Sequence, residues 1–396
     1  MSLSLIQNDT LTALADAVRE LTGTDFLYTP GEMTEALREL RTPDRAWTRP
    51  DGWPDYDSCV KRAGQDVLYL TCTPTEDNST VVFQITTAGG GQYLVERGSI
   101  DSGGFTAAEA ALVDSGTAYE ADLGTEDEYA VFRLTAPDDA LSSFCFGTTS
   151  AATSYPVGEI WGRVEDLTVP AYGFAGSELQ AVDILTGSVT LGARAFRECG
   201  AAYLNVRRWD AAPASLQHMF YNCGNLSAPD LGGWDTSNAK DMSQAFYHCT
   251  ALTGLDLSGW DTGSVTTLYY TFSGCTALTD LDLSGWNTEN VTTMAGLFSG
   301  CSGLVSLNLG GWDTGKVTTF SNAFTCSALT DFTPPEMHIS FSLSGCPLLS
   351  GDSIQAVIDC LQEVEEAQTL TLHSTVLAKL TEEQLAAAEA KGWTVA

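Results

Sequence analysis

The stretch WDTSNAKDMSQAFYHCTALTGLDLSGW, from Trp234 to Trp260, carries the pattern that decides the fold of much of this chain. Tryptophan returns at almost constant intervals of 25 or 26 residues, at Trp209, Trp234, Trp260, Trp286 and Trp312. Apolar residues return at fixed distances behind each tryptophan, and behind the third they are Val265, Leu268, Phe272, Leu278, Leu281 and Leu283. Self-similarity at one period of this length predicts a protein built from stacked repeats.

Each repeat predicts one coil of a right-handed, leucine-rich-repeat-type solenoid over residues 168–350. The Leu-x-Leu ending, as in Leu255 and Leu257, has the period of two expected of a strand with its leucines inward. The segment from Phe246 to Cys249 is expected to form one helical turn packed behind that strand. A single coil cannot bury its apolar face, so the core forms only where several coils stack.

Cysteine usage fits this repeat. Seven of the 11 cysteines fall at or near repeat spacing, at Cys199, Cys223, Cys249, Cys275, Cys301, Cys326 and Cys346. Cysteines one coil apart act as small buried apolar residues, so we expect reduced, structural thiols. The sequence has no CxxC pair and no Cys/His cluster with metal-ligand spacing, so we expect neither a cofactor nor a metal.

The segments outside the repeat predict three further parts. Two short amphipathic runs predict a helical hairpin over residues 1–41. Short runs rich in Val, Tyr, Phe and Thr predict an antiparallel β-sandwich over residues 45–160. A helix, strand, helix and strand pattern predicts a small αβ cap over residues 351–396, which would cover the open end of the solenoid. The expected fold class is therefore mixed α/β.

The charge of the chain limits the classes of partner that it can bind. It has 18 basic and 51 acidic residues and a net charge of −33, which repels nucleic-acid phosphates and anionic membranes. The sequence shows no apolar run long enough to span a bilayer and no secretory signal pattern at its start. We therefore expect neither nucleic-acid binding nor membrane insertion.

The 26-residue motif of Trp234 to Trp260 resembles the leucine-rich repeat of BspA-like bacterial surface proteins, through four coils. The N-terminal stretch LTALADAVRELTGTDFLYTPGEMTEALREL resembles a helical segment of tail-associated proteins of phages and prophages of gut bacteria. WTRPDGWPDYDS and the C-terminal LTLHSTVLAKLTEEQLAAAEAKGWTVA are also similar to parts of such proteins. Surface display by BspA-like proteins implies export signals and anchors, which this sequence lacks. The resemblance therefore favours a virion component over an exported adhesin.

One outward residue lies between the inward leucines of each coil, and these residues form a candidate acidic row: Asp230, Asp256, Asp282 and Asn308. Carboxylates at coil spacing repel each other unless something compensates. A bound cation or cationic ligand is one interpretation. The other is local hydrogen bonding to Ser258, Ser284 or backbone amides at the turn.

A second outward row varies between otherwise similar coils and gives the candidate recognition surface: Tyr221, Tyr247, His248, Tyr269 and Tyr270. Variation on a fixed scaffold is where a solenoid places recognition, and tyrosine supplies contact area at low entropic cost. The Asp-Thr pair after each tryptophan is interpreted as a turn cap.

These features predict a non-enzymatic structural and recognition protein of a phage or prophage tail, located in the virion. The N-terminal region would bind other tail or particle proteins, the solenoid would bind a host cell-surface protein or glycan, and a homo-oligomer is possible. The alternative is a bacterial surface adhesin or protein-interaction module at the bacterial cell surface. A glycan-degrading enzyme in the β-domain has no catalytic motif to support it.

Overall fold

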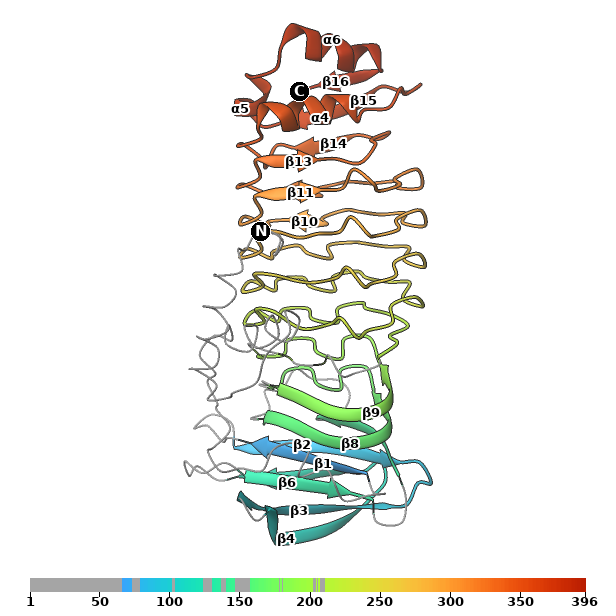
Figure 1. Ribbon diagram of the computed structural model, residues 1–396, viewed down its shortest axis with the longest axis vertical. Coiled ribbons are helices and arrows are strands. Elements are labelled where there is room, and N and C mark those ends of the chain that lie inside the picture. The colour runs from blue at the N-terminus through green and yellow to red at the C-terminus, as the bar shows by residue number, and fades with distance from the viewer. Residues whose placement is uncertain are drawn as a thin grey trace, which may run out of the picture. The chain divides into compact units, whose positions relative to one another are not determined.

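The computed structural model describes residues 66–72, 79–101, 104–123, 130–136, 140–146, 157–177, 179, 181–201, 204, 206 and 211–396 (Figure 1). Contacts divide the chain into Met1–Thr48 and Arg49–Ala396, and every described residue lies in the second unit. The predicted helical hairpin over residues 1–41 lies outside the described residues.

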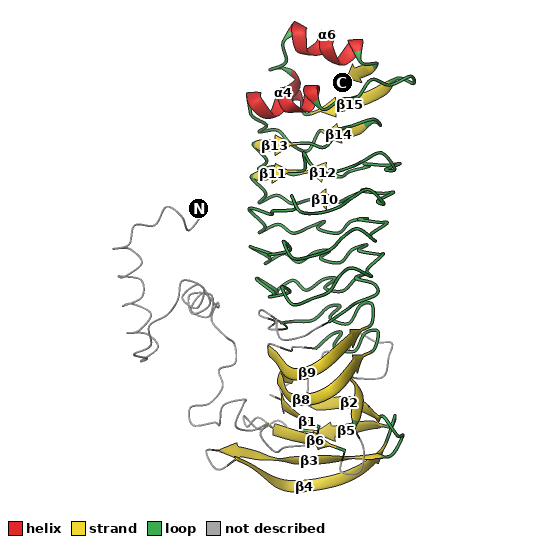
Figure 2. Cartoon of the chain, turned by 45° about the vertical axis from the view of Figure 1, so that its right-hand side comes forward, coloured by secondary structure: helices red, strands yellow, loops and turns green. Residues whose placement is uncertain are grey.

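The first described part is a nine-stranded sheet, in the order β4-β3-β6-β1-β8-β7-β2-β5, with β9 paired to β8 (Figures 1 and 2). Its strands are β1 (Val67–Cys72), β2 (Thr80–Thr87), β3 (Gln92–Asp101), β4 (Gly104–Asp114), β5 (Ala118–Asp122), β6 (Ala130–Thr135), β7 (Leu141–Phe146), β8 (Val157–Val169) and β9 (Ala181–Leu191). Most neighbours are antiparallel, but β7 with β8 and β8 with β9 are parallel.

The sheet curls over, so its two ends face each other. The ring centroids of Phe83 in β2 and Phe132 in β6 lie 5.9 Å apart, although β1, β8 and β7 separate these strands in the sheet. Both faces of β1 are buried, and on the second face Tyr69 stacks on Trp161 at 5.3 Å. The curled sheet thus encloses a core as a sandwich does, but from one sheet.

The predicted antiparallel sandwich ending at residue 160 needs correction here. Strand β8 runs through that boundary, pairing antiparallel with β1 and in parallel with β9 over Glu159–Val169. Parallel pairing is the arrangement of successive solenoid coils, so β8 and β9 belong to the sheet and also begin the stack. The alternating strand pattern expected of a sandwich does not distinguish this case, because a strand has the same period in either partner arrangement.

The coils beyond β9 are joined by backbone hydrogen bonds from the phenylalanine segment. The N–H groups of Gln244, Phe246 and His248 donate to carbonyls of the next coil at 2.7–2.9 Å. The N–H groups of the residues between them, Ala245 and Tyr247, close tight turns within the coil. The predicted helical turn is therefore wrong: the segment is a chain of turns in which alternate amides bond forward, an arrangement no helix allows.

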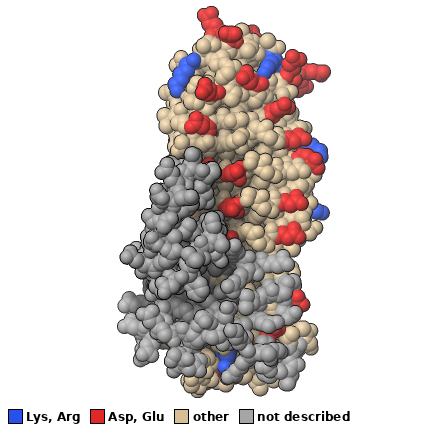
Figure 3. Space-filling view, viewed as in Figure 1, with Lys and Arg blue, Asp and Glu red and all other residues tan. Residues whose placement is uncertain are grey.

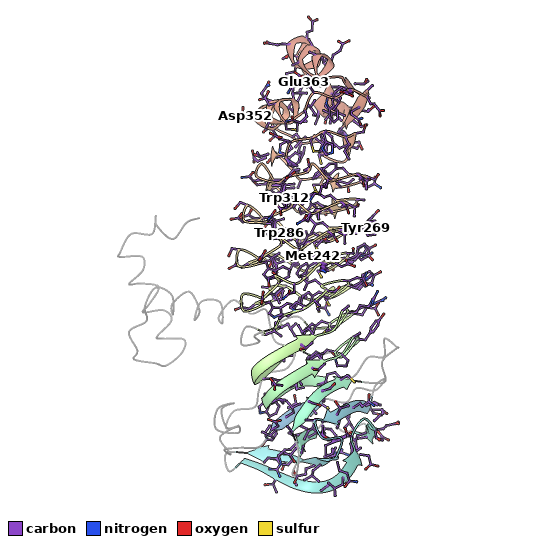
Figure 4. All side chains as sticks on the ribbon, turned by 90° about the vertical axis from the view of Figure 1, so that its right-hand side faces the viewer. Met242, Tyr269, Trp286, Trp312, Asp352 and Glu363 are labelled. Atoms are coloured by element: carbon purple, nitrogen blue, oxygen red, sulfur yellow. The ribbon has the colours of Figure 1, made fainter. Side chains whose placement is uncertain are left out.

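Two columns of stacked rings fill the interior. Phenylalanines stack from coil to coil with centroids 5.3–6.5 Å apart, at Phe174, Phe196, Phe220, Phe246, Phe272, Phe298 and Phe324. The column begins inside the sheet, because Phe144 of β7 lies 6.0 Å from Phe174. Tryptophans form the second column, and Trp286 and Trp312 are nearly parallel at 6.0 Å (Figure 4). The repeat solenoid predicted from the tryptophan period is confirmed.

A column of thiols runs beside the phenylalanines. From Cys223 to Cys346 each S–H group donates to the carbonyl of the phenylalanine one coil earlier, as Cys275 does to Phe246 at 3.1 Å and Cys301 to Phe272 at 3.0 Å. Burial raises the pKa of Cys301 to about 12 and that of Cys275 well above its usual range. All ten cysteines among the described residues are free, which confirms the reduced, structural role there.

The last coils contain short parallel strands, and a group of helices and strands follows. The paired strands are β10 (Phe298–Ser299) with β12 (Phe324–Thr325) and β11 (Ser306–Asn308) with β13 (Asp331–Thr333). Then come β14 (Phe341–Leu343), α4 (Gly351–Asp359), β15 (Gln368–Leu372), α5 (Ser374–Leu377), α6 (Glu382–Ala390) and β16 (Trp393–Val395). Strands β14, β15 and β16 form a parallel sheet. None of the described helices is both long and apolar enough to cross a bilayer.

We predict that Phe272→Ala lowers the free energy of unfolding by about 3–5 kcal/mol, because it removes one ring from the middle of a fully buried column. Urea unfolding followed by tryptophan fluorescence measures the change. Val305→Ala is the control, since Val305 is 44% exposed and its loss leaves no cavity. Equal midpoints for the two variants would contradict the column's role.

We also predict that the coil thiols resist alkylation at pH 8 while the protein is folded, because burial keeps them protonated and out of contact with the reagent. Mass spectrometry of the peptides containing Cys249, Cys275 and Cys301 tests this. These peptides should be unlabelled in buffer and fully labelled in urea. Labelling in buffer, or a disulfide-linked peptide among them, would show that the thiol column is wrong.

Candidate recognition surface

One face of the solenoid carries non-glycine residues in left-handed backbone conformation, coil after coil. Positive φ occurs twice per coil, four residues apart, as in Gln244 (φ 56°) and His248 (φ 56°). Such residues donate N–H groups to the next coil, as His248 does to Ser273 at 2.7 Å. Their register places equivalent side chains beside each other. We name this surface the turn face, formed by Tyr172, Arg194, Arg197, His218, Tyr221, Gln244, Tyr247, His248, Tyr269 and Tyr270.

The structure brings all five predicted recognition residues together on the turn face. Tyr221 stacks on Tyr247 with centroids 4.9 Å apart and ring planes 11° apart. Tyr247 also stacks on His248 at 4.3 Å and lies 6.3 Å from Tyr270. Tyr269, at the outer edge of its coil, is 4.6 Å from Tyr270 and 43% exposed (Figure 4). Residues of three consecutive coils thus form one continuous aromatic surface.

Two rings of this surface rest on glycines of the next coil. A Cβ atom on Gly274 would lie 2.4 Å from the ring of His248, and one on Gly296 would lie 2.6 Å from three ring atoms of Tyr270. Both glycines also have positive φ, 77° and 67°. The rings therefore lie flat on backbone, which fixes their orientation before any ligand arrives and lowers the entropic cost of binding.

The sequence pattern did not indicate Arg194 and Arg197, which lie at the other end of the turn face. The guanidinium group of Arg197 lies 4.7 Å from the centroid of Tyr221 and pairs with Glu198 at 2.9 Å. The guanidinium of Arg194 lies 5.6 Å from the centroid of Tyr172. These residues come from coils shorter than 26 residues, so the tryptophan period does not align them. The four-residue spacing of the outward residues on either side of each phenylalanine is the sequence pattern that could have located these arginines.

His218 lies between the arginines and the tyrosines. Its ring centroid is 5.2 Å from that of Tyr221, and its Nδ1 atom is buried with no hydrogen-bond partner among the described residues. Burial lowers the pKa of His218, and the charges of Arg194 and Arg197 lower it further. The imidazole is therefore mostly neutral at pH 7 and can accept or donate a hydrogen bond.

The acidic row lies at the turn that follows the Leu-x-Leu segment of each coil, and Asp and Glu side chains are frequent on the solenoid surface in Figure 3. Each member accepts a hydrogen bond from the backbone N–H two residues later: Asp230 from Gly232, Asp256 from Ser258, Asp282 from Ser284 and Asn308 from Gly310. The Ser258 hydroxyl also donates to Asp256 at 2.7 Å. These contacts favour the local interpretation of the acidic row, because hydrogen bonds from the turn amides stabilise the carboxylates.

The Asp-Thr pairs after the tryptophans serve the turns and the stacking. Asp261 accepts from the N–H of Gly263 at 2.9 Å, and the buried Thr262 hydroxyl donates to the carbonyl of Asn287 in the next coil at 3.0 Å. The turn-cap interpretation is confirmed for this pair. Within the described part of the chain, no three His, Cys, Asp or Glu side chains converge as metal ligands would.

Comparison with known proteins adds one match. Residues 214–333, which contain the most regular coils, match the family described as "Mycoplasma protein of unknown function, DUF285". A search of curated proteins and a search of solved structures found no match. The match and the stacked coils support a repeat solenoid of a surface or interaction protein.

Replacement of Asp282 tests whether the acidic row is structural. The backbone N–H and the hydroxyl of Ser284 lower the pKa of Asp282. A pKa lower in the folded protein means that this carboxylate stabilises the fold at neutral pH and ceases to do so as the pH falls through that value. We expect Asp282→Ala to lower the free energy of unfolding at pH 7 by at most about 1 kcal/mol.

Asp282→Asn is the matched variant, because Asn308 holds the equivalent position in the next coil. It should keep most of the stability while losing the pH dependence of this group. Chemical unfolding of both variants at pH 7 and pH 3 measures the difference. Equal loss in both variants at pH 7 would contradict the turn role and require that the charge itself is used.

Proposed function

We propose that this protein is a non-enzymatic recognition protein that binds a host cell-surface protein or glycan through the turn face of its solenoid. The observation that carries the proposal is the continuous surface formed by Tyr221, Tyr247, His248, Tyr269 and Tyr270. These residues differ from their equivalents in later coils, where Ser273 and Gly274 replace Tyr247 and His248. A stacked scaffold with one variable outer face is well suited to recognition.

The rigidity of the turn face supports this role. The tyrosine hydroxyls make no hydrogen bond with any described residue, while the rings below them are held by stacking or by glycine contacts. Fixed rings with unused hydroxyl groups offer contact area and hydrogen bonds at little entropic cost. A ligand therefore meets groups that are already in place.

We further propose that the protein belongs to a phage or prophage tail, as a tip or fibre-associated component of the virion. Its support is the resemblance of the N-terminal segment to tail-associated proteins. The N-terminal region would then bind other tail or particle proteins, and several copies of the chain would assemble together. Mass spectrometry of purified particles tests this proposal, and absence of the chain from every particle fraction would overturn it.

A bacterial surface adhesin or interaction module is the second candidate. The match of residues 214–333 and the BspA-like repeat support this candidate as much as they support a virion protein, because neither distinguishes a virion from a cell surface. Surface biotinylation of the producing bacterium, without phage induction, would identify the chain as a cell-surface protein. The same turn face would serve recognition in both cases.

The variant Tyr247→Ala/Tyr270→Ala tests the turn face itself. Loss of two central rings should weaken binding of the purified protein to host cells by about tenfold or more, because aromatic anchors carry most of the binding energy of a recognition surface. Flow cytometry with fluorescently labelled protein measures the apparent affinity.

Val305→Ala is the control for this experiment, since Val305 is exposed in a later coil and off the turn face. It should bind as the unchanged protein does. The double variant should keep the same thermal midpoint within a few degrees, which separates lost binding from lost folding. Undiminished binding of the folded double variant would remove the turn face as the recognition surface.

A further inference from the structure

We propose that the turn face binds a glycan carrying an isolated anionic group, with Arg194 receiving the anionic group and the tyrosines contacting the sugar rings. This inference rests on the proposed function, because it names the ligand class of the same surface. The relevant juxtaposition is a cationic end, around Arg194, followed by aromatic rings in the next three coils.

Of the two described arginines on the turn face, Arg194 is the one without a carboxylate partner among the described residues. It lies over the ring of Tyr172, 5.6 Å from the centroid, and forms no ion pair with any described residue. Arg197 differs, because Glu198 already accepts from its Nε and Nη2 atoms at 3.0 and 2.9 Å. The planar N–H donors of a guanidinium group fit the two oxygens of a carboxylate or phosphate.

The charges around Arg194 favour one anionic group over many. Among the described residues, two acidic side chains of this face already have partners: Glu198 pairs with Arg197, and Asp241 accepts from the N–H of Ser243 at 2.8 Å and from Nε2 of Gln217 at 2.9 Å. The whole chain carries a net charge of −33. A dense polyanion would meet that repulsion over the Debye length of about 8 Å, whereas a single group in contact with Arg194 largely avoids it.

The remainder of the turn face is polar and aromatic rather than aliphatic. Tyr269 is the one exposed large apolar residue on it, and the others among the described residues lie elsewhere, at Leu112, Val305, Leu348, Leu377 and Leu385. Tyrosine and arginine are also enriched at protein interfaces, but the apolar core of such an interface has no counterpart among the described residues of the turn face. Phenol hydroxyls, imidazoles and the Gln244 amide instead match the hydroxyl groups of a sugar chain.

The ring arrangement assigns different roles to the tyrosines. Tyr247 has Tyr221 on one face and His248 on the other, so it offers a ligand its edge and hydroxyl group. Tyr269 contacts Tyr270 edge to face and is 43% exposed, so a sugar ring can pack on it. The face therefore supplies an anion contact, then hydroxyl groups, then an exposed ring in consecutive coils.

The test uses the full chain and three oligosaccharides with one neutral backbone: one without charge, one with a single carboxylate and one with a single phosphate group. Isothermal titration calorimetry should show both charged probes binding at least about tenfold more tightly than the neutral one, because a charge-assisted contact contributes that factor. The two charged probes distinguish the source of the anionic group. Arg194→Gln should remove the difference, and Lys316→Gln, which loses the same charge on another surface, should not.

Three outcomes would overturn the inference. The first is a neutral probe that binds as tightly as the charged ones, and the second is a folded Arg194→Gln variant that keeps the preference for charge. The third is loss of cell binding after protease treatment but not after periodate treatment, which would identify a protein partner. In each case the proposed function still stands if Tyr247→Ala/Tyr270→Ala weakens cell binding, and it fails separately if that variant binds normally.

Discussion

Alternate backbone hydrogen bonding between coils is the interaction on which the rest of the structure depends. In each coil every second N–H of the phenylalanine segment bonds forward, and the N–H groups between them close turns within the coil. Most amides of this segment are thus bonded to backbone carbonyls, so the side chains that point inward can be mainly apolar. The rings of Phe246 and Phe272 stack at 5.5 Å because the backbone sets the interval between coils.

The same constraint joins the sheet to the solenoid. Strands β8 and β9 pair in parallel, so their spacing already matches that of the coils. Phe144 in the sheet and Phe174 in the first turn continue one ring column across the junction. The curled sheet thus covers the first coil with paired strands, and Val189 of β9 in turn bridges to Ala211 of the next coil.

The inward residues could be identified from the sequence because they repeat. Fewer features could be predicted where the repeat ends or where its spacing fits more than one local conformation. Apolar residues four apart fit a helical turn as well as the observed chain of turns, so the local conformation around Phe246 was mispredicted. Left-handed residues such as His218 and Gln244 carry no sequence mark, since glycine is the usual choice. The five candidate recognition residues were singled out by their variation between coils, whereas Arg194 lies in a shorter coil that the tryptophan period does not reach.

Because the coils stack one upon another, the spacing between coils also sets the distances between side chains on the turn face. Groups on this face are separated by whole coils, so the separation of Arg194 from Tyr269 changes only in increments of about 4.8 Å. Gain or loss of one repeat by recombination would move the two groups by one increment and leave the surroundings of each unaltered, because each coil contacts only its neighbours. In the proposed recognition role, the number of repeats between Arg194 and Tyr269 would therefore set the length of ligand that reaches both groups.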